Sequence, residues 1–136
     1  MATKKMLSLI IPAHNEEGSI KKTICSFHKE LKRSKILHEI LVINDNSTDK
    51  TEKVLKKLKK EIKELRYINN APPNGFGLAV RKGLENFKGN YVAMVMADLS
   101  DNPKDLVKMY QKALRGYDCV FGTRFNKKAR VEGYPL

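Results

Sequence analysis

The sequence has 136 residues, 41% of them hydrophobic, which suits a single domain that can bury its own core. Its 27 lysines and arginines outnumber the 15 aspartates and glutamates, and the net charge of +12 favours anionic partners such as nucleic acid, an anionic membrane surface or a nucleotide phosphate. Cys25 and Cys119 stand outside any metal or redox motif, and no apolar stretch approaches ~18 residues, which excludes a disulfide scaffold and a membrane span and predicts a soluble, cytoplasmic chain.

Apolar segments of two kinds alternate along the chain. Short runs without polar interruption predict buried strands, and longer segments with apolar residues every three or four positions predict helices. In chain order we expect strands over 6–11, 39–43, 66–69, 91–96 and 119–122, and helices over 16–33, after residue 49, over 78–87 and from 103 to 116. Because these strands are apolar throughout and are separated by helices, they predict an α/β fold with a parallel sheet covered on both faces.

All four predicted helices carry recognisable apolar positions. In chain order these are Ile20, Ile24, Phe27 and Leu31; Val54, Leu55, Leu58, Ile62 and Leu65; Leu78, Val80, Leu84 and Phe87; and Leu106, Val107, Tyr110 and Leu114. In a parallel sheet, ligands bind beyond the carboxyl ends of the strands, so the loops after the strands are the places where we expect chemistry.

Two of these loops carry aspartates. Asp45 follows the second predicted strand, and Asp98 and Asp101 follow the fourth. Because the carboxyl ends of parallel strands meet at one edge, these carboxylates could converge in one crevice, where a basic protein would use them to hold Mg²⁺ or Mn²⁺ against a diphosphate. The alternative is that they cap the following helices, which is the favoured interpretation for residues 47–49.

Residues 74–77 (Asn-Gly-Phe-Gly) form a glycine-rich segment before the third predicted helix. The segment matches neither the P-loop nor the dinucleotide-binding fingerprint. Its glycines would allow close backbone approach, and the helix that follows would offer free N–H groups to a phosphate. A plain turn before the helix is an equally good interpretation.

Taken together, five motifs in chain order resemble those of family-two glycosyltransferases. They are residues 11–17 (V-P-x-Y-N-E in the family), 42–49 (V-D-D-x-S-x-D), 74–83 (N-x-G-x-x-x-A-x-x-x-G), 96–100 (at the D-x-D metal motif) and 122–125 (G-S-R-[FY]). The last is typical of the polyprenyl-phosphate branch, which includes dolichol-phosphate mannosyltransferase. Each motif alone is weakly specific, but the ordered set covers almost the whole chain.

The resemblance implies the glycosyltransferase A fold, a Rossmann-like αβα sandwich with a mostly parallel sheet. It implies transfer of a sugar, with inversion, from a GDP- or UDP-sugar to an acceptor, in this branch a polyprenyl or dolichyl phosphate. Asp98 would act in catalysis by meeting the Mg²⁺ or Mn²⁺ ion on the donor's diphosphate, with Asp101 as a second metal ligand. The residues expected to contact the nucleotide-sugar are Pro12, His14, Glu16, Asp45, Gly75, Ala97, Asp98 and Arg124.

Three departures from the family pattern bear on this expectation. Met96 replaces the first aspartate of the D-x-D motif, and because a thioether is a poor ligand for a hard cation, Asp101 would have to compensate. His14 replaces the usual tyrosine but can still stack on a base. Residues 1–136 are expected to form one nucleotide-sugar-binding domain that stops before the acceptor-side half, so no general base is assigned.

The basic second helix and the three histidines are two further features of the sequence. Residues 50–66 carry eight lysines or arginines, which we interpret as a solvated helix face with pairs to Glu52, Glu61 and Glu64; contact with the cytoplasmic face of a membrane is an alternative, and nucleic-acid binding is disfavoured because aromatic residues are not interleaved. The three histidines lie too far apart in sequence to predict a metal site, and we expect His28 to face solvent.

The sequence is compatible with three functions: a metal-dependent sugar transferase, a module that binds the nucleotide-sugar without turnover, and, more remotely, a nucleic-acid-binding domain. The base, the sugar, the acceptor and the oligomeric state are left open by the sequence.

Overall fold

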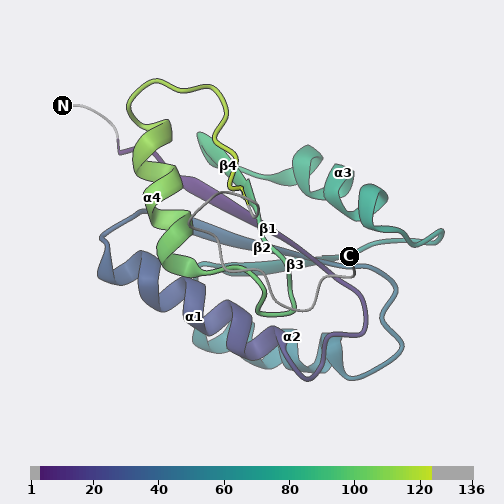
Figure 1. The fold of residues 1–136 in the computed structure, drawn as a ribbon. Helices are drawn as coiled ribbons and strands as arrows, with labels where there is room; N and C mark the ends of the chain where they lie inside the picture. Colours follow the sequence, from purple (N-terminus) through teal and green to yellow (C-terminus); the bar gives the residue numbers. More distant parts are fainter. Residues whose placement is uncertain (1–3, 124–136) are drawn as a thin grey trace, which may run out of the picture.

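The computed structural model describes residues 4–123, in which strands and helices alternate. The elements are β1 (Leu7–Ala13), α1 (Ile20–Arg33), β2 (His38–Asn44), α2 (Thr51–Glu61), β3 (Leu65–Asn69), α3 (Phe76–Asn86), β4 (Tyr91–Met94) and α4 (Pro103–Ala113). The strands pair in parallel in the order β3-β2-β1-β4. Each strand is joined to the next by a helix, as parallel pairing requires, and the predicted α/β class is confirmed (Figure 1).

The two faces of the sheet are covered unequally. Helices α1, α2 and α4 lie on one face, and α3 lies alone on the other (Figure 1). The larger core lies under the three helices and contains Phe27 and Leu55 among its buried residues. The smaller core lies under α3 and is formed by Ile10, Leu41, Ile43 and Ala79. The αβα sandwich expected from the family resemblance is therefore present.

Helix α1 confirms the predicted inner face, since its four apolar positions at 20, 24, 27 and 31 are all at most 1% exposed. The helix begins at Ile20 rather than at Glu16. The Glu16 carbonyl accepts the backbone N–H groups of Ser19 and Ile20, which closes a turn before the helix. Residues 16–18 consequently belong to the loop that follows β1, where side chains are available to a ligand.

Helix α3 packs through small residues rather than through its large apolar ones. Leu78 and Leu84 are 43% and 49% exposed, whereas Ala79 and Gly83 are buried. A Cβ atom added at Gly83 would lie 2.5 Å from Ile10 Cγ2, so the helix backbone sits close against β1. The large residues mark the outer side of this helix because the contact with the sheet leaves no room for them.

Strand β4 is shorter than predicted, and the predicted strand at 119–122 is wrong. The strand ends at Met94, although the Val95 N–H still donates to the Ile10 carbonyl (2.9 Å), and the Met96 N–H donates to Asp101 Oδ2 (2.8 Å) in the loop that follows. Residues 119–122 are irregular, and Phe121 is 88% exposed. A strand needs a paired neighbour for its backbone groups, and within residues 4–123 none of the strands pairs with this segment.

On the α3 side, a polar network lies near the start of the strands. The Glu39 carboxylate accepts hydrogen bonds from the Ser8 hydroxyl (2.7 Å), the Lys88 N–H (2.6 Å) and Arg66 Nε (2.9 Å). Arg66 also donates to the Asn86 carbonyl at the end of α3. Burial opposes ionisation of Glu39, but these hydrogen bonds and the charge of Arg66 outweigh it and hold its pKa below the ordinary value of 4.5.

The basic outer face of α2 carries one of the expected ion pairs, Lys56 with Glu52 at 3.6 Å. Glu64, which we had expected to pair with this face, lies 3.6 Å from His28 instead. Among the described residues, no helix is both long and apolar enough to cross a bilayer.

Candidate nucleotide-sugar site

The loops after β1 and β2 interlock through Asn15. Its side-chain oxygen accepts the N–H groups of Thr48 (2.7 Å) and Asp49 (3.3 Å), and its own N–H donates to the Ser47 hydroxyl (3.0 Å). Asn15 has a φ of 52°, a left-handed conformation that asparagine tolerates better than most residues. The two loops therefore form one rigid rim at the carboxyl end of the sheet.

Helix α2 begins in this rim. The cap residue of the helix is Lys50, which makes no side-chain cap hydrogen bond, but Asp49 Oδ1 accepts the Thr51 N–H (2.9 Å) in the first turn, whereas the Ser47 and Thr48 hydroxyls lie against Asn15. The Thr51 hydroxyl accepts the Glu16 N–H (2.9 Å), which adds a further bond between the two loops. Capping is thus combined with positioning of the first loop.

Asp45 is 4% exposed and joins the β3–α3 loop to this rim. Its Oδ2 accepts the Gly75 N–H (2.8 Å), and its Oδ1 lies within hydrogen-bond distance of the side-chain amides of Asn70 (3.3 Å) and Asn46 (3.2 Å). The carboxylate therefore holds the glycine-rich segment in place, and Gly75 lies immediately before α3. Asp45 and Gly75, which the sequence assigned to the same site, are in direct contact.

The remaining candidates Pro12, His14 and Glu16 lie at the end of β1 and in the loop that follows it. His14 is exposed, and its Nδ1–H donates to the Asp45 carbonyl (2.7 Å), which fixes the orientation of the imidazole. Pro12 is half-buried within β1. The half-buried Glu16 carboxylate accepts a hydrogen bond from the Ser19 hydroxyl (2.8 Å).

The loop after β4 is held by hydroxyl groups of α1. The buried Ala97 presents its carbonyl to the Ser19 (2.9 Å) and Thr23 (2.8 Å) hydroxyls. The Ser19 hydroxyl is thus within hydrogen-bond distance of both Glu16 and Ala97, and it connects the first loop to the fourth. Sequence reasoning missed Ser19 and Thr23. The signal that could have suggested them is a pair of hydroxyl side chains one turn apart near the start of the first predicted helix.

Asp98 follows Ala97 and is exposed at the carboxyl edge. Its Oδ1 accepts the Ser100 N–H (3.0 Å), and the intervening Leu99 has a φ of 68°, so the loop turns sharply around the carboxylate. Asp101 lies in the same loop, where its Oδ2 is used by the Met96 N–H. Arg124 lies outside the described residues.

The expected convergence of Asp45, Asp98 and Asp101 into one carboxylate cluster is not found. Within residues 4–123, the group of three or more potential metal ligands that lie together is His28, His38 and Glu64. Asp45 is occupied by backbone and amide donors instead. The exposed oxygen ligands of the Asp98 loop still suit a hard divalent ion, because such an ion takes only one or two carboxylates when a diphosphate supplies the rest.

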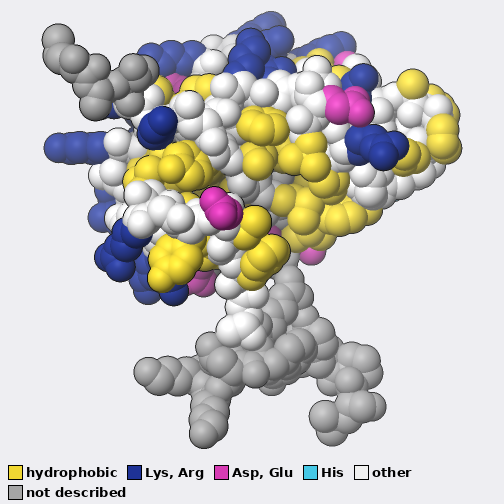
Figure 2. Space-filling model, turned by 90° about the horizontal axis from the view of Figure 1, so that it is seen from above, with side chains coloured by type: hydrophobic (Ala, Val, Ile, Leu, Met, Phe, Trp, Pro, Cys, Tyr) yellow, Lys and Arg dark blue, Asp and Glu magenta, His cyan; other side chains and the backbone are white. Residues whose placement is uncertain are grey.

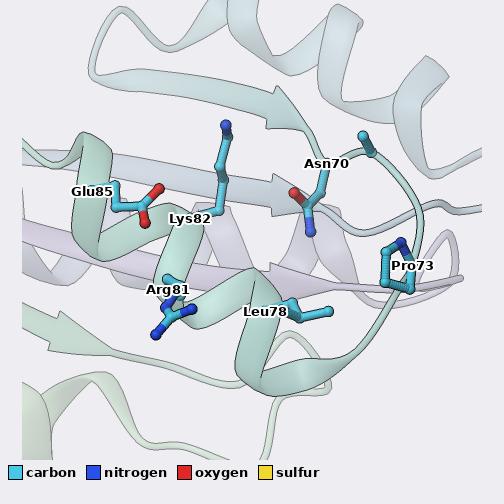
Figure 3. A pocket seen from close by; sticks show the side chains of 7 residues that line it. Asn70, Pro73, Leu78, Arg81, Lys82 and Glu85 are labelled. Atoms are coloured by element: carbon cyan, nitrogen blue, oxygen red, sulfur yellow. The ribbon is translucent and has the colours of Figure 1, made fainter.

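A shallow hollow of about 200 Å³ adjoins the Asp45 network (Figure 3). It lies between α3 and the β3–α3 loop, and the side chains that line it come from Asn70, Ala71, Pro73, Leu78, Arg81, Lys82 and Glu85. Asn70 links the hollow directly to Asp45, and Arg81 and Lys82 place positive charge on its α3 side. The sequence analysis assigned no binding role to Arg81 and Lys82, because a basic pair on a helix carries no specific signal.

Comparison with known proteins identifies the family and the fold. Residues 8–136 match the family described as glycosyl transferase family 2. An uncharacterized glycosyltransferase of Synechocystis sp. is 32% identical over 125 residues, which is 92% of this chain and 39% of that protein. A dolichol-phosphate mannosyltransferase of Pyrococcus furiosus is 26% identical and is matched over 96% of this chain and 36% of its own length. The chain thus spans less than two fifths of these relatives.

Two solved structures share the fold. A mannosyltransferase from Pyrobaculum calidifontis in complex with GDP-Man and Mn²⁺ has a TM-score of 0.61 at 22% identity, with 71% of this chain and 28% of that chain covered. Glucosyl-3-phosphoglycerate synthase from Mycobacterium tuberculosis, in complex with Mn²⁺, UDP-glucose and phosphoglyceric acid, has a TM-score of 0.67 at 22% identity, with 82% and 40% covered. The fold is therefore that of the glycosyltransferase A enzymes, and this chain belongs to glycosyl transferase family 2.

Proposed function

We propose that this chain is the donor-binding part of a glycosyltransferase that transfers a sugar from a GDP- or UDP-sugar, with inversion, to a polyprenyl or dolichyl phosphate. The observation that carries the proposal is the set of four loops at the carboxyl edge of the sheet. Asp45 joins three of them, and the Ser19 hydroxyl joins the fourth. Polar side chains from the family's motifs are thereby held around one edge, where parallel sheets bind nucleotides.

In this proposal the nucleoside lies against the rim formed by Pro12, His14, Glu16 and Asp45. The diphosphate lies towards Gly75 and Ala97, where the start of α3 offers backbone N–H groups, and Arg124, outside the described residues, remains an expected diphosphate contact from the family motif. Asp98 holds Mg²⁺ or Mn²⁺ on the diphosphate, and Asp101 contributes its remaining oxygen or positions the loop through Met96. The ion would neutralise the charge that develops on the leaving diphosphate.

The donor assignment draws support from the relatives, because solved structures with the same fold hold GDP-Man or UDP-glucose with Mn²⁺. The lipid acceptor draws support from the mannosyltransferase of Pyrococcus furiosus. The net charge of +12 favours a place at an anionic membrane surface on the cytoplasmic side, where such an acceptor is found.

Calorimetric titration with GDP-mannose, UDP-glucose and UDP-N-acetylglucosamine, each with and without Mn²⁺, tests the donor site. We expect one donor to bind more tightly with Mn²⁺, and Asp98→Asn to lose at least about tenfold of that metal-dependent affinity. Asp118→Asn is the matched control, because it removes an exposed aspartate that follows α4. Failure of every nucleotide to bind, or equal metal dependence in Asp98→Asn, would contradict the proposal.

A second candidate, a module that binds the donor without turnover, is favoured by the coverage of less than two fifths of the relatives' length. Incubation of the chain with the bound donor and a short-chain polyprenyl phosphate separates the two functions. Appearance of the glycosylated lipid supports the transferase, and donor binding without product supports the module.

A further inference from the structure

Three side chains converge at the opposite edge of the sheet, where the strands begin. His28 lies in the second half of α1, His38 is the first residue of β2, and Glu64 immediately precedes β3. The distance from His28 Nδ1 to His38 Nε2 is 3.0 Å, and that from His28 Nε2 to Glu64 Oε2 is 3.6 Å. One ligand atom from each residue lies within 4.8 Å of the other two. The expectation that His28 faces solvent is wrong, since its side chain is 16% exposed.

The histidine pair is held in a defined tautomer. His38 is 6% exposed, and its Nδ1–H donates to the Ile36 carbonyl (2.8 Å). That bond places the proton on Nδ1, so His38 Nε2 presents its lone pair towards His28. A histidine whose other ring nitrogen donates to a backbone carbonyl is the usual arrangement at metal centres, because the bond fixes the ring and leaves the ligand atom free.

We propose that His28, His38 and Glu64 bind a transition-metal ion of the Zn²⁺ class. Two imidazoles and one carboxylate form a nitrogen and oxygen ligand set that suits Zn²⁺ rather than Mg²⁺. Ligand atoms around a tetrahedral Zn²⁺ lie about 3.3 Å apart, close to the observed separation of the two histidine nitrogens. Glu64 is 17% exposed at its side chain and reaches the ion by a change of rotamer, and water completes the coordination.

Without the ion, His28 Nδ1–H donates to His38 Nε2. Binding of the ion at His28 Nδ1 requires the other neutral tautomer, so the ring proton is transferred to His28 Nε2, and the neutral ring loses no proton overall. Burial favours the neutral imidazole by lowering the pKa of His28, although Glu64 acts in the opposite direction. The ion would tie α1 to the starts of β2 and β3, at the edge remote from Asp98, so its role would be to stabilise the fold rather than to meet the donor.

The test uses residues 1–136 without an affinity tag, stripped with a chelator, in zinc calorimetry and thermal unfolding. With free Zn²⁺ about a hundredfold above Kd, we expect Tm to rise by roughly 10 °C. Co²⁺ should give the visible absorption bands of a tetrahedral site, and Mg²⁺ should change nothing. His28→Gln and Glu64→Gln should each weaken Zn²⁺ binding by at least about tenfold.

Three controls make the result decisive. His14→Gln removes the histidine at the other edge, Glu61→Gln removes an exposed glutamate near Glu64, and Asp98→Asn removes the proposed donor-site ligand. All three should bind Zn²⁺ like the parent chain, so failure here is distinct from failure of the proposed function. Circular dichroism establishes whether each variant is folded. If His28→Gln does not fold, the Zn²⁺ affinity of Glu64→Gln decides the test. The proposal is overturned if the parent fails to bind Zn²⁺, or if the folded ligand variants bind it equally well.

Discussion

The two faces of the sheet are built in different ways. Under α1, α2 and α4, the core is apolar and closed, with Phe27 and Leu55 at most 1% exposed. On the other face, α3 alone covers part of the sheet, and the Glu39–Arg66 network lies at the end where the strands begin. Beside α3, apolar side chains of β4 remain open, with Val92 40% and Met94 52% exposed. Figure 2 shows hydrophobic side chains gathered on this face.

The difference indicates where the folding free energy resides. Buried apolar area contributes about 25 cal/mol per Å², so the three-helix face should dominate stability. The α3 face combines small-residue packing, one partly buried ion pair and apolar side chains that remain exposed. Substitutions on the two faces should therefore differ in kind as well as in size.

The largest effect is expected on the closed face. Phe27→Ala removes a ring that is 1% exposed and leaves a cavity among α1 and the sheet, which should cost about 3–5 kcal/mol of unfolding free energy. Urea unfolding followed by circular dichroism measures this cost. A loss below about 1 kcal/mol would mean that the three-helix face is not the main core.

The next largest effect is expected from the polar network on the α3 side. Glu39→Gln leaves Arg66 with an uncompensated charge, and because Arg66 is 27% exposed, we expect a loss of about 2–4 kcal/mol rather than the full cost of a buried pair. The folded-state pKa of Glu39 is lowered, so its stabilisation is present above pH 4.5 and is lost as the pH falls through the folded-state value. Urea titrations at pH 7 and in acid should show that the unfolding free energy depends less on pH in Glu39→Gln than in the parent. An equal pH dependence in both would mean that other groups cause the loss of stability in acid.

A smaller effect should come from the close approach of α3 to β1. Gly83→Ala places a Cβ atom 2.5 Å from Ile10 Cγ2, and the resulting shift should cost about 1–3 kcal/mol, even though alanine favours a helix. Gly77→Ala on the same helix is the matched control, because a Cβ there meets nothing within 4 Å. Chemical unfolding should show no loss for Gly77→Ala, or a gain of up to about 1 kcal/mol. Similar values for both variants would mean that α3 does not rest on β1 at Gly83.

The smallest effect is expected at Met94, where half of the side chain is already in water. Met94→Ser should change the unfolding free energy by about 0.5 kcal/mol or less if this face is open in solution. The same urea titration measures it. A loss above about 2 kcal/mol would show that something covers β4, and analytical ultracentrifugation would then establish whether a second copy does so.

The sequence predicted those parts of the fold that depend on local pattern. The inner face of α1 and the parallel class follow from apolar spacing and uninterrupted strands. The segment at 119–122 has the same apolar pattern as the true strands, but strand formation also depends on a partner, which local pattern does not reveal. Likewise, the large residues of α3 gave no sign that Ala79 and Gly83 would face the sheet, because close packing is decided by the distance between backbones.

The candidate site was predicted residue by residue but not in its connections. Asp45 and Gly75 were assigned separately and are in contact, whereas the expected carboxylate cluster is absent because Asp45 is used by neighbouring backbone and amide groups. The roles of Asn15 and Ser19 depend on residues some 30 to 80 positions away in the chain, which no spacing rule identifies. The histidine pair was missed although His28 and His38 are only 10 positions apart, because they meet only where α1 runs back along β2.

The hydrogen bonds from the Ser19 and Thr23 hydroxyls to the Ala97 carbonyl connect the loop after β4 to α1. Ser19 and Thr23 stand at the start of the helix whose apolar side anchors the main core, so the peptide before Asp98 is fastened to the most firmly folded part of the molecule. Binding of a ligand to Asp98 is therefore coupled to α1 through the Ala97 peptide. Occupancy of that carboxylate should be felt as slower amide exchange along α1, far from any atom that the ligand touches.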